Sequence, residues 1–251
     1  SDAADLTHAR GRGVAFHRAQ LARADLSHAS LRRARLVGTD LRQARLVHTD
    51  LTTALLLRAR VAGADFTRAT LDFARMGGLD LRRAVWDDAS FVGARMRACR
   101  LDGLALPGAN FSAACLEGAE MTATRMHGAS FRHANLISAR MAEIDWEGAD
   151  LRDADLTGAH FHMGSSRGGL VDSTIASEGT RTGFYTDDYD EQSFKSPEEI
   201  RKANLRGADL RGAQVEGADF YLVDLREARY SVAQKRHFLR TGAILQDKRI
   251  G

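Results

Sequence analysis

The sequence has few prolines, which interrupt regular structure, few cysteines, which form cross-links, and no long apolar run of the kind that spans a membrane. Its 251 residues include only two prolines and two cysteines, and aromatic side chains make up 7%. No run of about 18 apolar residues occurs, and no succession of charged, apolar and small residues resembles a signal peptide. We therefore expect no membrane segment and no export. The low cysteine count predicts a reduced, cytoplasmic location rather than a disulfide framework.

Large apolar residues recur at every fifth position, as in the stretch ASLRRARLVGTDLRQARLVHTDL of residues 29–51. An α-helix advances about 100° per residue, so this step would scatter the apolar side chains around all its faces. In a flat strand the odd step would alternate them between the two sides. The spacing instead predicts a chain that bends in the same sense after each five residues, so that every fifth side chain points to a common axis.

The period extends from Leu6 to Phe161 with one gap, at Gly11. A small residue, usually alanine, stands two positions before each large one, as Ala34 does before Leu36. Residues two apart share a side of an extended segment, so both members of the pair should point inward. The residue before the large one and the two after it are left to face the solvent.

The pentads ANFSA, ADLRD, ADLTG, ANLRG, ADLRG and ADFYL closely resemble the A(D/N)LXX consensus of the pentapeptide-repeat family. The resemblance covers residues 6 to 161 and 203 to 230. It implies an all-β fold, a right-handed quadrilateral β-helix with about four pentads per coil. Residues 6 to 161 would form about eight coils, a rod roughly 38 Å long at about 4.8 Å per coil.

The period divides the chain into four regions. We predict a main β-helix at 1–163, a non-repeat insert at 164–202, resumed repeats at 203–230, and a C-terminal helix and cap at 231–251. In the insert, Ser196 followed by Pro197 and two acids predicts a short helix near 197–202. The stretches SVAQKRHFLR and TGAIL predict a helix and a closing segment that cover the open end of the coil.

Bulky residues stand at three positions where the coil expects small ones: Leu79, Leu104 and Ile144. Pro107 follows directly after a core position. Each of these departures predicts a local bulge in the wall of the coil.

Outward side chains, sorted by coil, give the rod two oppositely charged sides. The arginine face surrounds Phe16, Leu36, Leu56, Met76 and Met96, and its six arginines outweigh Glu117 and Asp155, for a net charge of +4. These arginines are Arg18, Arg35, Arg58, Arg75, Arg95 and Arg97. The acidic face surrounds Leu6, Leu26, Leu46, Phe66, Trp86, Met126 and Trp146. Its net charge is −4, from Asp5, Asp25, Asp65, Asp87, Asp88, Asp145 and Glu147 against Arg45, Arg68 and Arg125.

The arginine face has two interpretations. It is either a solvated surface that charge keeps soluble, or a contact surface for phosphates or an acidic protein, because aligned guanidinium groups suit both. The outward aliphatic residues Val37, Leu55 and Leu57 lie on the same face, and no aromatic residues are interleaved for stacking on bases. We therefore expect a protein partner rather than DNA, while scattered surface aliphatics remain the alternative.

Two other groups are candidates for binding. Tyr185, Asp187 and Tyr189 belong to the polar insert and would line a pocket between it and the coil. His8, His28 and His48 recur at a spacing of 20, which predicts a column of imidazoles. Neighbouring rungs could share a zinc ion, or the column is a solvent-exposed product of the repeat.

Catalysis has little support in the sequence. The acids are mostly the repeat's own aspartates, and no phosphate-cradling glycine loop precedes a helix. Neither Cys99 nor Cys115 has a neighbouring His and acid that would activate a thiolate, and we expect no disulfide between them. We predict no enzyme activity, no catalytic residue and no cofactor.

Two functions compete. The first is a protein–protein interaction or scaffold module, such as an appendage of a larger adaptor or secretion-related protein; the repeat is already under way near Ser1, which fits a domain of a longer chain. The second follows from the resemblance, since some family members mimic B-form DNA, bind type II topoisomerase (gyrase) and protect it from inhibitors. A mimic needs a strongly acidic surface, whereas this chain has 36 Lys and Arg against 33 Asp and Glu. Dimerisation through a coil end is common in the family, so a homodimer is an open expectation.

Overall fold

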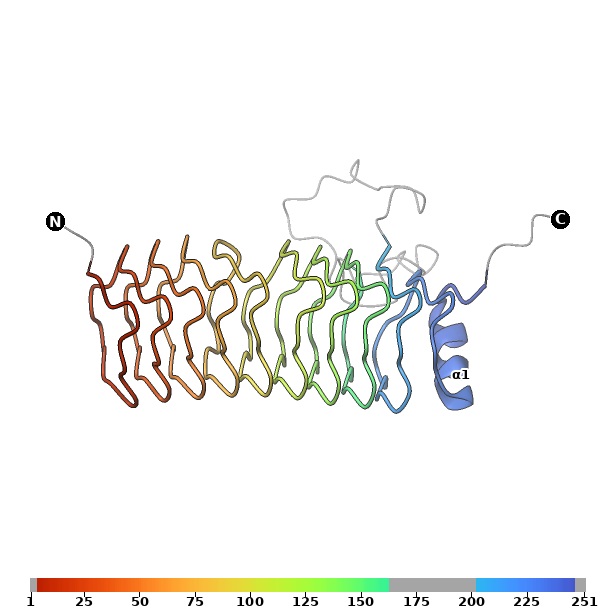
Figure 1. The fold of residues 1–251 in the computed structure, drawn as a ribbon. Helices are drawn as coiled ribbons and strands as arrows, with labels where there is room; N and C mark the ends of the chain where they lie inside the picture. Colours follow the sequence, from red (N-terminus) through yellow and green to blue (C-terminus); the bar gives the residue numbers. More distant parts are fainter. Residues whose placement is uncertain (1–3, 163–201, 247–251) are drawn as a thin grey trace, which may run out of the picture.

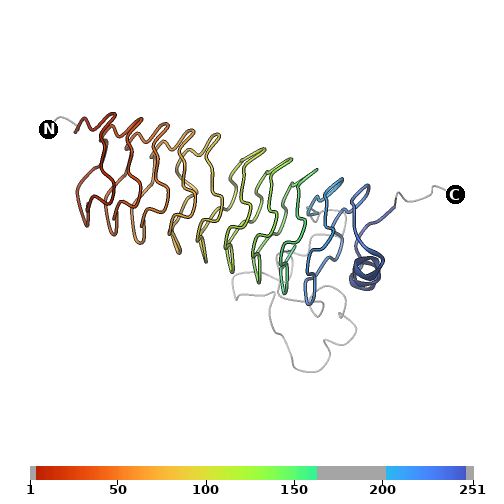
Figure 2. The ribbon, with the colours of Figure 1, turned by 60° about the horizontal axis from the view of Figure 1, so that its bottom comes forward.

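The computed structural model describes residues 4–162 and 202–246, which form a rod of stacked coils (Figures 1 and 2). Parallel bridges join residues 20 apart, as Asp5 with Asp25 and Asp25 with Arg45. Within the first coil the bridged residues are five apart: Asp5, Arg10, Ala15 and Gln20. Four pentads therefore complete each coil, and the predicted quadrilateral β-helix is confirmed.

A tight turn in each pentad supplies the regular bend. In the first turn the N–H of Ala9 donates to the carbonyl of Leu6 at 3.1 Å, and His8 between them has a φ of 57°. Glycine adopts a positive φ without steric cost, and Gly13 takes this place in the next turn. Residues as large as Phe73 also take it, with a φ of 58°. The repeated coil therefore imposes the turn even where the local residue disfavours it.

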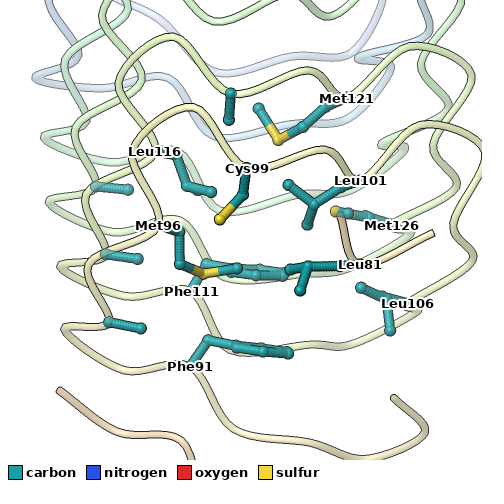
Figure 3. Packing of buried hydrophobic residues seen from close by; sticks show 14 of the residues in the cluster. Leu81, Phe91, Met96, Cys99, Leu101, Leu106, Phe111, Leu116, Met121 and Met126 are labelled. Atoms are coloured by element: carbon teal, nitrogen blue, oxygen red, sulfur yellow. The ribbon is translucent and has the colours of Figure 1, made fainter. Parts of the chain in front are cut away.

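The paired inward positions fill the interior. Leu36, Leu56 and Met76 from successive coils are fully buried, as are most of the alanines that precede them by two positions. Aromatic side chains stack along the axis, with the ring centroids of Phe91 and Phe111 4.9 Å apart. Figure 3 shows Phe91 and Phe111 among leucine, methionine and cysteine side chains that enter the same interior from successive coils. The expected alternation of bulky and small core residues is thus confirmed.

The ladder of bridges is interrupted near three of the four residues that predict a bulge, namely Leu79, Leu104 and Pro107. The structure describes Arg60, Asp80, Val85 and Ala105, but no bridge joins Arg60 to Asp80 or Val85 to Ala105. These gaps lie beside the bulky residues Leu79 and Leu104, and the second leaves a hollow of about 370 Å³ lined in part by Pro107.

The ladder of bridges continues past the bulge predicted at Ile144. The next residue, Asp145, keeps its bridges to Arg125 and Asn204, and Ile144 is fully buried. The turn itself is altered, because the N–H of Ile144 does not donate to the carbonyl of Met141 as the corresponding N–H groups do in the other described turns.

The coil resumes in register after the insert. Asp145 is bridged to Asn204, Asp150 to Asp209 and Asp155 to Gln214, so each spacing of 59 replaces the usual 20. The apolar period is therefore out of phase in the sequence after residue 201, but the coils stay in register, because the 39 residues 163–201 are inserted at a turn. The predicted helix near 197–202 and the candidates Tyr185, Asp187 and Tyr189 lie almost wholly outside the described residues.

Helix α1, Val232–Thr241, covers the C-terminal end of the rod, as the sequence predicts (Figure 1). Ser231 and Gln234 form a capping box at its start, and Gly242 ends it with a φ of 84°. Phe238 is fully buried on the last coil, where its ring centroid lies 4.7 Å from that of Phe220. The described residues contain no helix long and apolar enough to cross a bilayer.

Candidate partner-binding face

The arginine face is built from outward side chains on successive coils of the N-terminal half. Arg35, Leu55, Arg75 and Arg95 form one column in which each residue is bridged to the next. The three arginines of this column are exposed and Leu55 is half-buried. The structure therefore brings together residues that the sequence analysis could only sort by their spacing.

The other predicted residues of this face flank that column. Val37, Leu57 and Arg97 each follow a core residue, and Val37 and Leu57 are half-buried on adjacent coils. Arg18 and Arg58 occupy the third residue of their turns, with φ values of 54° and 60°, and are exposed at the corner of the coil. Arginines thus lie on both sides of a small aliphatic strip.

Most of these arginines lack an acidic partner in the part of the chain that the structure describes. Arg97 pairs with Glu117 at 2.7 Å. The other five, in contrast, form no ion pair with any residue that the structure describes: Arg18, Arg35, Arg58, Arg75 and Arg95. Their charges are therefore available to a partner.

The position of each arginine within its pentad explains this difference. In several pentads on other faces, an aspartate stands before the core residue and an arginine follows it, so the arginine folds back, as Arg82 does onto Asp80 at 2.6 Å and Arg211 onto Asp209 at 2.6 Å. On the arginine face, Arg35, Leu55 and Arg75 themselves occupy the place of the aspartate. Among the described residues, no carboxylate forms an ion pair with Arg35 or Arg75.

A hollow of about 330 Å³ opens at the corner of this face, lined by Arg18, Gln20, Gly38, Asp40, Arg58 and Arg60. It exists because Gly38 has no side chain between those of the arginines one coil below and one coil above. Asp40 does not neutralise the hollow, since both its oxygens bind Arg42 at 2.9 and 2.6 Å, and this contact lowers the pKa of the Asp40 carboxyl. The hollow was not predicted from the sequence, although the spacing of 20 between positions 18, 38 and 58 indicates it.

The acidic face is less uniform than its residue count predicts. Its bridged column begins Asp5, Asp25, Arg45 and Asp65, so the charge changes sign along the rod. Arg45 pairs with Asp25 at 3.7 Å, and farther along Arg68 pairs with Asp88 at 3.3 Å. This face therefore differs from a continuous anionic strip.

One group on the acidic face could hold a cation. His127, Asp145 and Glu147 each offer a ligand atom, and these atoms lie within 4.8 Å of one another. The His127 Nε2 atom already lies 2.9 Å from an Asp145 oxygen, and Asp145 also accepts a hydrogen bond from Asn204 at 2.8 Å. This group was not predicted from the sequence either, although residues 127 and 147 are 20 apart.

The histidine column forms as expected. The rings of His8 and His28, and those of His28 and His48, have centroids 5.0 Å apart and planes tilted by only 9° and 15°. A zinc ion bound at about 2.0–2.1 Å lies near the plane of its imidazole, so nearly parallel rings do not converge on a shared ion. This arrangement favours a solvent-exposed column produced by the repeat over a shared zinc site.

The two cysteines have different surroundings. Cys99 is buried with its sulfur 3.0 Å from the carbonyl of Met76, and burial raises its pKa to about 12. Cys115 is half-buried and bridged to Arg95 at the end of the arginine column. Both are free, and burial leaves the Cys99 thiol essentially protonated near neutral pH.

Comparisons with known proteins agree with the coil. The sequence profile described as pentapeptide repeats matches eight copies, at residues 19–56, 64–103, 89–128, 129–162 and 200–229. A similar solved structure is HetL, a pentapeptide repeat protein involved in heterocyst differentiation regulation from the cyanobacterium Nostoc sp. strain PCC 7120. It shares 22% identity over 99% of this chain and 92% of its own, with a TM-score of 0.55.

Weaker structural matches include QnrB1, a plasmid-mediated fluoroquinolone resistance protein. Its identity is 17% over 92% of this chain and 95% of its own, with a TM-score of 0.41. A pentapeptide repeat protein of the Arabidopsis thaliana thylakoid lumen shares 18% identity over 61% of this chain and 79% of its own, also with a TM-score of 0.41. No curated protein sequence matches significantly. The repeat profile covers well over half of the residues, and the chain belongs to the pentapeptide-repeat family.

Proposed function

We propose that this protein is a non-enzymatic interaction module that binds a protein partner through its arginine face. The observation that carries the proposal is the contrast between arginines: those of the Asp-Leu-Arg pentads fold back onto aspartate, whereas Arg35, Arg75 and Arg95 project without an acidic neighbour in the described residues. A coil with a filled interior can present such a column rigidly, so little conformational entropy is lost on binding.

The neighbouring residues favour a protein over nucleic acid. Val37, Leu55 and Leu57 place aliphatic surface between the arginines, which suits an apolar contact ringed by ion pairs. Single-stranded nucleic acid is usually held by aromatic side chains that stack on its bases, and the described part of this face has no Phe, Tyr or Trp. The two free cysteines agree with a reducing cytoplasmic location for the complex.

Affinity capture from the source cell's lysate tests the proposal. The intact protein is compared with a variant carrying Arg35→Glu, Arg75→Glu and Arg95→Glu. A control variant carries Arg33→Glu, Arg132→Glu and Arg140→Glu, which changes the net charge equally at exposed positions on other faces. We expect a protein that the intact and control forms retain and the first variant loses. Equal capture by all three forms would contradict a role for the arginine face.

The same experiment tests the DNA-mimic alternative. A gyrase subunit recovered with all three forms would indicate binding through another surface, and the acidic face would then be the first to mutate. The alternation of Asp25, Arg45 and Asp65 along that face speaks against this outcome, because a mimic of B-form DNA needs closely spaced negative charge.

A further inference from the structure

The aspartate or asparagine of the repeat closes a hydrogen bond that each turn would otherwise leave open. Its side chain accepts the N–H of the residue just after the core residue, as Asp25 does for Ser27 at 2.9 Å. Asparagine does the same, since Asn135 accepts from Ile137 at 3.0 Å. These N–H groups point outward and have no acceptor in the coil's own ladder.

On the arginine face this acceptor is missing from consecutive coils. The residues before the four core positions are Arg35, Leu55, Arg75 and Arg95. The N–H groups of Val37, Leu57, Gly77 and Arg97 accordingly donate to no acceptor within the described ranges. Farther along the same column the acceptor returns, where Asp155 accepts from Thr157 at 3.0 Å.

The open donors form a regular, accessible row. Bridges link the four preceding residues from coil to coil, so neighbouring donors are spaced by about 4.8 Å, the separation of paired strands. Val37, Leu57 and Gly77 are half-buried and Arg97 is exposed, so a ligand at the surface can reach these residues. The adjoining column holds the guanidinium groups of Arg35, Arg75 and Arg95, which form no ion pair with a described residue.

We propose that this row binds the carboxylates of an acidic protein segment, each taking the place of a missing aspartate side chain. Each carboxylate would accept a backbone N–H with one oxygen and pair with Arg35, Arg75 or Arg95 through the other, a charge-assisted arrangement. The inference rests on the proposed function and specifies the chemistry of the partner. The occupant is a segment rich in Asp or Glu with some aliphatic residues, which complements the charge of the face and the strip of Leu55 and Leu57.

A pair of amide substitutions tests the role of the N–H groups apart from charge. Leu55→Asn with Arg75→Asn should supply the face's own acceptors for Leu57 and Gly77, as Asn135 does for Ile137. Leu55→Gln with Arg75→Gln changes charge and polarity identically, but its amide is one carbon too long to copy that geometry. Poly-L-glutamate serves as the probe, and its dissociation constant is measured by calorimetry for the intact protein and both variants.

We expect poly-L-glutamate to bind the asparagine variant about tenfold more weakly than the glutamine variant, because two charge-assisted hydrogen bonds are blocked. In amide NMR spectra the N–H signals of Val37, Leu57, Gly77 and Arg97 should move on titration of the intact protein. Unchanged melting temperatures would show that both variants remain folded.

Three results would overturn the inference. Equal weakening in the two variants would mean that the arginines bind without the N–H groups, which leaves the proposed function intact. The intact protein could fail to bind poly-L-glutamate while the charge-reversed variant still loses a lysate protein. This result would reject the recognition of carboxylates but not the proposed function. Duplex DNA that binds with the same preference for the glutamine variant would reassign the row to phosphates.

Discussion

Aspartate before a core residue has two roles in this coil. In one pentad, Asp80 accepts the backbone N–H of Arg82 at 3.2 Å and binds its guanidinium at 2.8 and 2.6 Å. The first contact completes the turn, and the second neutralises both side chains. A pentad with arginine or leucine at the same place loses both contacts, as happens at Arg35, Leu55 and Arg75 on the arginine face.

These contacts predict that the protein loses stability in acid. The hydrogen bonds from Arg82 lower the pKa of Asp80 from 3.8 to about 2, and the pKa values of Asp150 and Asp209 are lowered in the same way. A carboxyl whose pKa is lower in the folded state stabilises it fully above the unfolded pKa and less as the pH falls. We expect the free energy of unfolding to hold from about pH 7 to about 4 and to decline between about 4 and 2.

Urea unfolding of Asp80→Asn across this range checks the cause. The amide can still accept the backbone N–H but cannot ionise, so the variant should be less stable at neutral pH and show a smaller loss in acid. Asp87→Asn removes the same charge at an exposed residue without an ion pair among the described residues and serves as the control. An identical acid profile for wild type and Asp80→Asn would show that the ion pair contributes nothing.

Much of the arginine face could be predicted from the sequence, because a side chain's column depends only on its position in the period. The spacing placed Arg35, Arg75 and Arg95 in one column, as the structure finds. Counting charges by face could not tell paired from unpaired residues, since pairing depends on which carboxylate is in reach. Arg97, counted among the available arginines, is held by Glu117 one coil away at 2.7 Å.

At the scale of elements, the C-terminal helix shows that a sequence pattern can predict where a helix begins but not how it packs. The motif of Ser231 followed by Gln234 predicts the start of α1, but not that Gln234 also reaches the last coil. Its Nε2 atom donates to the carbonyls of Leu210 and Ala213 at 2.7 and 2.8 Å. These contacts depend on how the helix docks, which local propensity does not determine.

Gln234→Ala should therefore loosen the cap of the rod. The substitution removes two hydrogen bonds from buried carbonyls and half of the capping box, and we expect a loss of about 2–3 kcal/mol in the free energy of unfolding. Hydrogen exchange should increase mainly in the last coil and α1. Lys235→Ala, at an exposed position of the same helix, is the control and should leave stability nearly unchanged. Equal effects of the two substitutions would contradict a capping role for Gln234.

At the scale of the whole molecule, the sequence predicted a rod of four-pentad coils but not how the rod crosses the insert. The apolar period changes phase between Phe161 and Leu205, which reads as a break when the chain is followed residue by residue. In space the bridge from Asp145 to Asn204 continues the ladder. An insertion of any length at a turn leaves the register intact, and periodicity alone cannot distinguish this from a new start.

The register predicts that residues 163–201 can be deleted. Joining His162 to Lys202 leaves two residues between Phe161 and Ala203, the number found in the other turns, so Asn204 can still pair with Asp145. If loop closure is the main term, removing 39 residues should raise the free energy of unfolding by roughly 3 kcal/mol. Poly-L-glutamate binding should not change, since the arginine face lies in the N-terminal half.

A deletion one residue longer, 163–202, provides the control for register. It would move Asn204 to the inward small position and Leu205 to the solvent-facing bridge position, so the last coils would lose their core. We expect a lower melting temperature and a second unfolding transition for this variant, measured by circular dichroism. If both deletions unfold alike, or if the shorter one also loses the last coils, then residues 163–201 support the coil rather than interrupt it.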